Sequence, residues 1–156
     1  MYLFPHKFKK PSAWIFYSSV VFGISYLFFY STISSFTAEL DLKVPMFFSD
    51  HLMNGPQFWK KNNVLDEIIS IFIIISGLLY GFSRERVEDE LIHKIRLESL
   101  AWSVQVNFAF VLMETIFIFG LHFFEVMIIQ LFLILLLFNL KQEISLNQFY
   151  HSSDEK

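Results

Sequence analysis

The sequence predicts an all-α fold, an integral membrane four-helix bundle whose third helix extends into the cytoplasm. Three observations lead to this class. Hydrophobic residues make up 54% of the 156 residues and charged residues only 17%, whereas about a quarter of a typical soluble domain is charged. Phenylalanine alone contributes 21 residues, more than a small soluble core could bury. The apolar residues also gather in four segments, each near the length of about 20 residues that a helix needs to cross a bilayer.

The four predicted spans cover residues 13–36, 64–82, 100–121 and 123–140. Each is expected to be a helix, because unpaired backbone polar groups are not tolerated in lipid. The first span is longer than the apolar region of a signal peptide and no small-residue cleavage site closes it, so we expect it to be retained. Asn63 is a candidate N-cap for the second span. The third and fourth spans are joined only by residues 120–122, which predicts an antiparallel hairpin.

The distribution of lysine and arginine predicts the orientation, because cytoplasmic loops carry an excess of these residues. Nine lie on one side of the predicted spans: Lys7, Lys9, Lys10, Arg84, Arg86, Lys94, Arg96, Lys141 and Lys156. Three lie on the other: Lys43, Lys60 and Lys61. We therefore expect a multi-pass protein of a bacterial inner membrane with both termini in the cytoplasm. Residues 37–63 would form an outer loop, and the polar residues 147–156 a flexible cytoplasmic tail.

A dense run of charge over residues 83–99 separates the two hydrophobic halves. Acidic residues come first and basic residues later, which complements a helix dipole, and opposite charges recur four residues apart. We expect the third helix to begin near Arg84, capped by Ser83, and to form a charged cytoplasmic helix before it enters lipid. This helix is either a solvated extension or a docking surface for a protein partner or a second copy. The candidate docking residues are Arg84, Arg86, Glu88, Asp89, Glu90, Lys94, Arg96 and Glu98.

A metal site is the third interpretation of this segment. The pair Glu90-x-x-His93 has the spacing that carboxylate-bridged di-iron bundles use. Such a site needs further carboxylates at the same level, and the other short-spaced pair, His122 with Glu125, belongs to the opposite face of the membrane in the predicted topology. We therefore predict neither a metal nor another cofactor.

The candidate polar residues inside the predicted spans are Asn107, Glu114 and Gln130. A carboxylate within a span is costly and marks a candidate functional site. Glu114 and Gln130 each lie eight residues from His122, so a tight hairpin would place them at similar depth. One interpretation is an uncharged Glu114 hydrogen-bonded to Gln130 or to a hydroxyl such as that of Ser70. A proton-coupled or ligand-binding role and a self-association contact remain open.

Catalytic motifs are absent: the sequence has no G-x-S-x-G, H-E-x-x-H or Walker A pattern and no cysteine. The net charge of -3 includes no basic patch of the kind that binds nucleic acid. We therefore predict that the protein is not an enzyme and that its partners are the lipid bilayer and a protein, either another chain or a second copy.

Two passages carry a resemblance to a known family. Leu3-Phe-Pro-His-Lys-Phe-Lys-Lys10 and Ser83-Arg-Glu-Arg-Val-Glu-Asp-Glu-Leu-Ile-His-Lys-Ile-Arg-Leu-Glu-Ser-Leu100 resemble a family of small four-helix bacterial inner-membrane proteins of uncharacterised activity. Members of that family tend to have lysine where Arg84 or Arg86 stands, which keeps the charge. The resemblance implies the topology described above and implies no catalytic residues.

The functional expectation is a non-enzymatic interaction or regulatory protein that presents the charged cytoplasmic helix to a partner. The alternative is a small transporter or channel-like bundle that uses Glu114. Transporters often contain broken helices and two repeated halves. The sequence shows neither a visibly broken helix nor a convincing repeat, which argues against this alternative.

Overall fold

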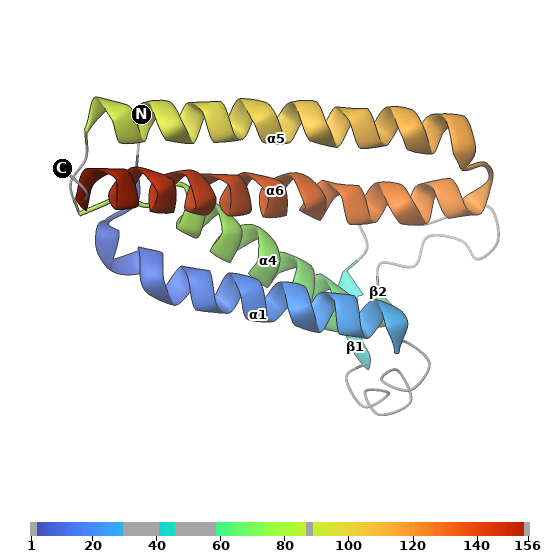
Figure 1. The fold of residues 1–156 in the computed structure, drawn as a ribbon. Coiled ribbons are helices and arrows are strands. Elements are labelled where there is room, and N and C mark those ends of the chain that lie inside the picture. The colour runs from blue at the N-terminus through green and yellow to red at the C-terminus, as the bar shows by residue number, and fades with distance from the viewer. Residues whose placement is uncertain (1–2, 30–40, 46–58, 87–88, 155–156) are drawn as a thin grey trace. The chain divides into compact units, whose positions relative to one another are not determined.

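The computed structural model describes residues 3–29, 41–45, 59–86 and 89–154. Within these residues the chain is mostly helical (Figure 1), so the all-α class is confirmed. The elements are the 3-10 helix η1 (His6–Phe8), the helices α1 (Lys9–Phe28), α4 (Leu65–Gly81), α5 (Glu90–Phe117) and α6 (Leu121–Asp154), and the strands β1 (Asp41–Pro45) and β2 (Trp59–Asn63).

The chain divides into two compact units. Unit 1 comprises Met1–Phe16 and Ile73–Lys156, and unit 2 comprises Tyr17–Phe72. Unit 1 therefore contains the start of α1, the end of α4 and the whole of α5 and α6. Both passages that carry the family resemblance lie in unit 1.

Unit 2 contains a short antiparallel sheet inside the predicted outer loop. Strands β1 and β2 pair with Asp41 opposite Asn63 and Pro45 opposite Trp59. The ladder satisfies backbone hydrogen bonds that an irregular loop would leave to solvent, and it ends just before α4 begins at Leu65. The middle of the predicted loop, residues 46–58, lies outside the described residues.

The first predicted span is shifted toward the N-terminus. The predicted range was 13–36, whereas α1 begins at Lys9 directly after η1. Pro11 lies in the first turn of α1, where its missing N–H removes no intrahelical hydrogen bond. The Ser12 hydroxyl donates to the Phe8 carbonyl at 2.5 Å. Residues 30–36 of the predicted span lie outside the described residues.

Helix α4 matches its predicted range of 64–82 to within one residue at each end. Gly77 and Gly81, one turn apart, lie against α6. An added Cβ on Gly77 would lie 2.3 Å from Leu135 Cδ2, and one on Gly81 would lie 2.3 Å from Phe138 Cε1. The spacing is the small-xxx-small pattern that lets two helix backbones approach closely. The Asn139 amide donates to the Gly77 carbonyl at 3.2 Å across this contact.

Helices α5 and α6 run side by side as the predicted antiparallel hairpin (Figure 1). The turn lies earlier than expected, at residues 118–120 rather than 120–122. The Ile118 N–H closes α5 by donating to the Glu114 carbonyl at 2.8 Å. Gly120 has a φ of 79°, a left-handed conformation that glycine adopts without a steric penalty. Gly120 therefore ends the turn instead of starting it.

Helix α6 is longer than the predicted span of 123–140, and the predicted flexible tail is wrong for residues 147–154, which are helical. Buried residues recur four apart along one face of α6: Phe138, Gln142 and Leu146. Such a stripe continues to bury one face after the apolar run ends. The described polar residues of the tail lie mainly on the exposed face of α6, so their abundance did not indicate a flexible segment.

Within the part of the chain that the structure describes, three helical segments are long and apolar enough to cross a membrane: His6–Phe28, Glu90–Phe117 and His122–His151. Many large apolar side chains on these segments are exposed. Examples are Trp14 at 81%, Phe28 at 83%, Leu112 at 65% and Phe117 at 70%. An exposed apolar surface of this extent is unusual on a soluble monomer.

Candidate functional site

The N-terminal segment pairs with the connector between α4 and α5. The Phe4 N–H donates to the Phe82 carbonyl at 2.9 Å, and the Arg84 N–H donates to the Phe4 carbonyl at 2.9 Å. These two bonds form a parallel bridge between Phe4 and Ser83. His6 Nδ1 donates to the Arg84 carbonyl at 2.8 Å. The two passages that carry the resemblance therefore lie against each other in the fold.

An ion pair joins the same two segments through their side chains. Lys9 at the start of α1 pairs with Glu85 in the connector. Glu85 is buried, with 8% of its surface exposed. A carboxylate is rarely buried without a cation beside it, so the approach of Lys9 allows the connector to fold inward at this residue.

Arg96 is also buried, with 1% of its surface exposed, so its predicted place on a docking surface is wrong. Its Nη2 donates to the Ser83 carbonyl at 3.1 Å. The buried residues of α5 are Ile92, Arg96, Ser99 and Ser103, which follow helical spacing along one face. The side chain of Arg96 lies on that inward face, which the density of charge in the sequence concealed.

The predicted helical start near Arg84 is wrong as well. Residues 84–86 are not helical, and α5 begins at Glu90 with Asp89 as its N-cap. The Asp89 carboxylate accepts the Glu90 N–H at 2.7 Å. The Ser83 hydroxyl donates back to the Leu79 carbonyl instead of capping α5. The connector backbone is extended because it pairs with Phe4.

Six of the eight predicted docking residues are exposed: Arg84, Arg86, Asp89, Glu90, Lys94 and Glu98. Lys94 and Glu98 form an ion pair at 3.7 Å on the outer face of α5. Glu88 lies outside the described residues. We call Asp89, Glu90, Lys94 and Glu98 the outer charged face.

The predicted pairing of Glu114 with Gln130 is wrong. Gln130 Nε2 donates to the Asn107 carbonyl at 2.8 Å. The hairpin is centred on Phe119, three residues before His122 (122 − 119 = 3). Gln130 is 11 residues after this centre, so its counterpart is 11 residues before it, at position 108 (119 − 11 = 108), next to Asn107. Glu114 instead lies in the last turn of α5.

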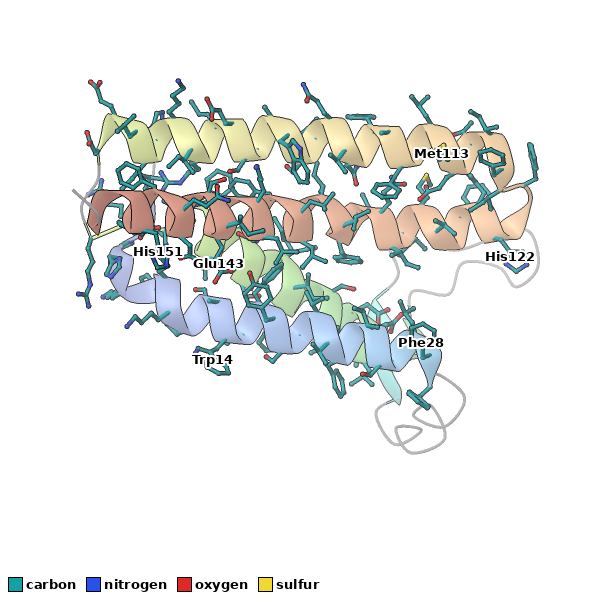
Figure 2. All side chains as sticks on the ribbon, viewed as in Figure 1. Trp14, Phe28, Met113, His122, Glu143 and His151 are labelled. Carbon is teal, nitrogen blue, oxygen red and sulfur yellow. The ribbon has the colours of Figure 1, made fainter. Side chains whose placement is uncertain are left out.

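Among the described residues, no three histidine or acidic side chains are grouped in a way that could hold a metal ion. The pair Glu90 and His93 stands at the start of α5, and His122 stands at the start of α6. The length of the hairpin separates them. Figure 2 shows Met113 and His122 near the turn, and Glu143 and His151 in the opposite half of α6.

Unit 1 contains an open pocket of about 630 Å³ where the start of α1, the end of α4, the connector and the C-terminal part of α6 meet. Its charged and titratable lining consists of His6, Lys9, Lys10, Glu85, Arg86 and Glu143, and its remaining lining of Ala13, Tyr80, Leu146, Asn147 and Tyr150. A smaller cavity shares Lys9, Tyr80, Glu143 and Leu146 with this pocket and adds Gly81, Asn139 and Gln142. Of these residues, only Arg86 was among the predicted site residues.

Sequence reasoning missed the rest of this region, in part by overlooking signals that were present. These signals were the spacing of Gly77 and Gly81 and the polar residues Asn139 and Gln142 at the end of an apolar run. The pairing of Lys9 with Glu85 joins residues 76 positions apart, and a single sequence has no signal for such a contact. Comparison with protein-family models, with curated proteins and with solved structures finds no match to this chain.

Proposed function

We propose that the chain is an integral protein of a bacterial inner membrane. Helices α1, α4, α5 and α6 cross this membrane as a four-helix bundle. The three long apolar helices support this proposal. Helix α4 has 17 residues, a length of about 26 Å at 1.5 Å per residue. That length is at the lower limit for crossing a hydrocarbon layer of about 30 Å.

The separation of polar and apolar surface supports the same proposal within unit 1. The charged side chains of the connector, of the start of α1 and of the start of α5 gather where the end of α4 and the C-terminal part of α6 also lie. The turn of the hairpin exposes Phe117 and Phe119 instead. The indole of Trp14, 81% exposed and close to the charged end, fits a position at a membrane interface.

In this membrane the protein acts as a non-enzymatic interaction or regulatory protein, and the outer charged face on α5 meets a protein partner. The exposure of Lys94 and Glu98 carries this proposal. A surface ion pair contributes little to stability, about 0–1 kcal/mol. The charges of Lys94 and Glu98 are therefore of little use to the fold and can serve recognition, where charge complementarity sets specificity.

The topology is tested by labelling single introduced cysteines. Because the sequence has no natural cysteine, each label reports one position only. Glu98→Cys and His122→Cys are placed at the two ends of the hairpin. A membrane-impermeant maleimide added outside spheroplasts should label His122→Cys and not Glu98→Cys, and inverted vesicles should give the reverse. Labelling of both from one side would refute the spanning hairpin.

The docking role is tested by a photo-crosslinking residue at position 94 in living cells. A discrete adduct is expected there and not at Gln148, an exposed position on α6. The double change Glu90→Lys and Glu98→Lys should abolish the adduct. An adduct of twice the chain mass identifies a second copy as the partner. No adduct, or one that survives charge reversal, would refute the docking role.

A further inference from the structure

We propose that the 630 Å³ pocket of unit 1 binds a phosphate ester. The pocket is distinct from the outer charged face, and the inference does not depend on a partner binding there. Its volume falls in the range of about 300–1,000 Å³ that is usual for small-molecule sites.

The mouth of the pocket is basic. Lys9, Lys10 and Arg86 contribute three positive charges and Glu85 and Glu143 two negative ones, so the net charge is +1 (3 − 2) with His6 neutral. Lys9 is already paired with Glu85. Among the described residues, Lys10 and Arg86 make no ion pair, and both are exposed. The pocket thus offers two cations to an anion from solution or from a membrane surface.

The chemistry of these cations favours phosphate. A guanidinium presents a planar pair of donors that matches two phosphate oxygens, and an ammonium adds a point charge. Lys10 lies in the first turn of α1, where the helix dipole also favours an anion.

A separate cavity of about 10 Å³, room for about one water molecule, is lined by Asn139 and Gln142, 1% and 4% exposed. The side-chain oxygens of both residues have no hydrogen-bond partner within the protein. The amide nitrogen of Asn139 donates to the Gly77 carbonyl. This cavity is too small for the ligand, which occupies the larger pocket alone.

The apolar part of the lining narrows the ligand class. Ala13 and Leu146 also line the pocket, so an organic phosphate gains contacts there that inorganic phosphate lacks. This chemistry occurs in the head group of a glycerophospholipid and in a free polyol phosphate.

The experiment measures binding to the purified full chain with two probes. Glycerol 3-phosphate is titrated into the detergent-solubilised protein by calorimetry. Phosphatidylglycerol is tested against phosphatidylcholine in nanodiscs by native mass spectrometry. Binding of the first probe identifies a free phosphate ester as the source, and selective retention of the second identifies a lipid head group.

The variants are matched for charge. Lys10→Glu should weaken binding at least tenfold, whereas Lys7→Glu, three residues away, exposed and outside the pocket, should change it less than twofold. Arg86→Gln should weaken binding without reversing charge, which keeps the test valid if Lys10→Glu fails to fold. Gln142→Met, of similar size, alters only the separate small cavity and should change binding less than twofold. Equal effects at Lys7 and Lys10, or no binding of either probe to the unaltered chain, would overturn the proposal.

Discussion

Replacement of Gly81 by alanine sets two effects of opposite sign against each other. Alanine is favoured over glycine in a helix interior by about 1 kcal/mol. However, its Cβ would lie 2.3 Å from Phe138 Cε1 and 2.7 Å from Asn139 Oδ1. The first distance is 1.1 Å short of ordinary contact at 3.4 Å (3.4 − 2.3). Helix α4 or the phenyl ring must therefore move.

The ring has little room to move. Phe138 is 1% exposed and its centroid lies 5.3 Å from that of Phe82. Overpacking of this kind costs about 1–3 kcal/mol. Because the buried ring has so little room, we take the upper end of that range; after subtraction of the gain in helix propensity, we expect Gly81→Ala to lower the free energy of unfolding by about 2 kcal/mol (3 − 1).

The assay is equilibrium unfolding of the purified chain in mixed micelles by titration with dodecyl sulfate, followed by circular dichroism. Leu78→Ala, at an exposed position three residues away, is the control for a change in α4. Phe138→Leu should partly rescue Gly81→Ala, because it removes the ring that the new methyl group meets. A Gly81→Ala chain as stable as the unaltered one, or more stable, would refute the close approach of α4 and α6.

Further predictions concern the charged and polar side chains. Lys9→Met should destabilise the chain by about 3 kcal/mol by leaving Glu85 buried without its cation, and the added change Glu85→Leu should recover most of the loss in the same titration. Asp89→Ala should cost about 1 kcal/mol and accelerate hydrogen exchange in the first turn of α5. Gln130→Leu should cost about 0.6–1.7 kcal/mol in unfolding free energy. The transporter alternative predicts a pH-dependent flux in liposomes that Glu114→Gln abolishes, and equal flux through both chains would remove Glu114 from that role.

The sequence was a good guide wherever one local property decided the structure. The apolar run of α4 is bounded by polar residues on both sides, so its predicted ends lie within one residue of Leu65 and Gly81. The hairpin was predictable because two apolar runs are separated by a few residues. The position of its turn was not, because a glycine can either start a turn or end one. That small shift moved the expected partner of Gln130 by about one and a half helical turns, from Glu114 to position 108.

The candidate site was less predictable, because tertiary contacts overrode local rules there. Residues 83–99 satisfy the charge pattern of a continuous helix, yet the connector backbone pairs with Phe4 and delays α5 to Glu90. Arg96 belongs to the inward face of α5 and donates to the Ser83 carbonyl, although it stands in a segment dense with charge. The delayed start of α5 depends on an N-terminal segment about 80 positions away, and helix propensity carries no information about it.

The bridge between Phe4 and Ser83 has a consequence for biogenesis. Residues near the start of the chain leave the ribosome first, but their hydrogen-bonding partners are synthesised 79 residues later (83 − 4 = 79). The Phe4 backbone must therefore remain uncommitted while α1 and α4 are being made, and the bridge can close only after the end of α4 has emerged. Closure of a loop of this length comes late and slowly in folding, and the ligand pocket proposed above, which is also lined by Glu143 and Leu146 of α6, can form only after the last helix has been made.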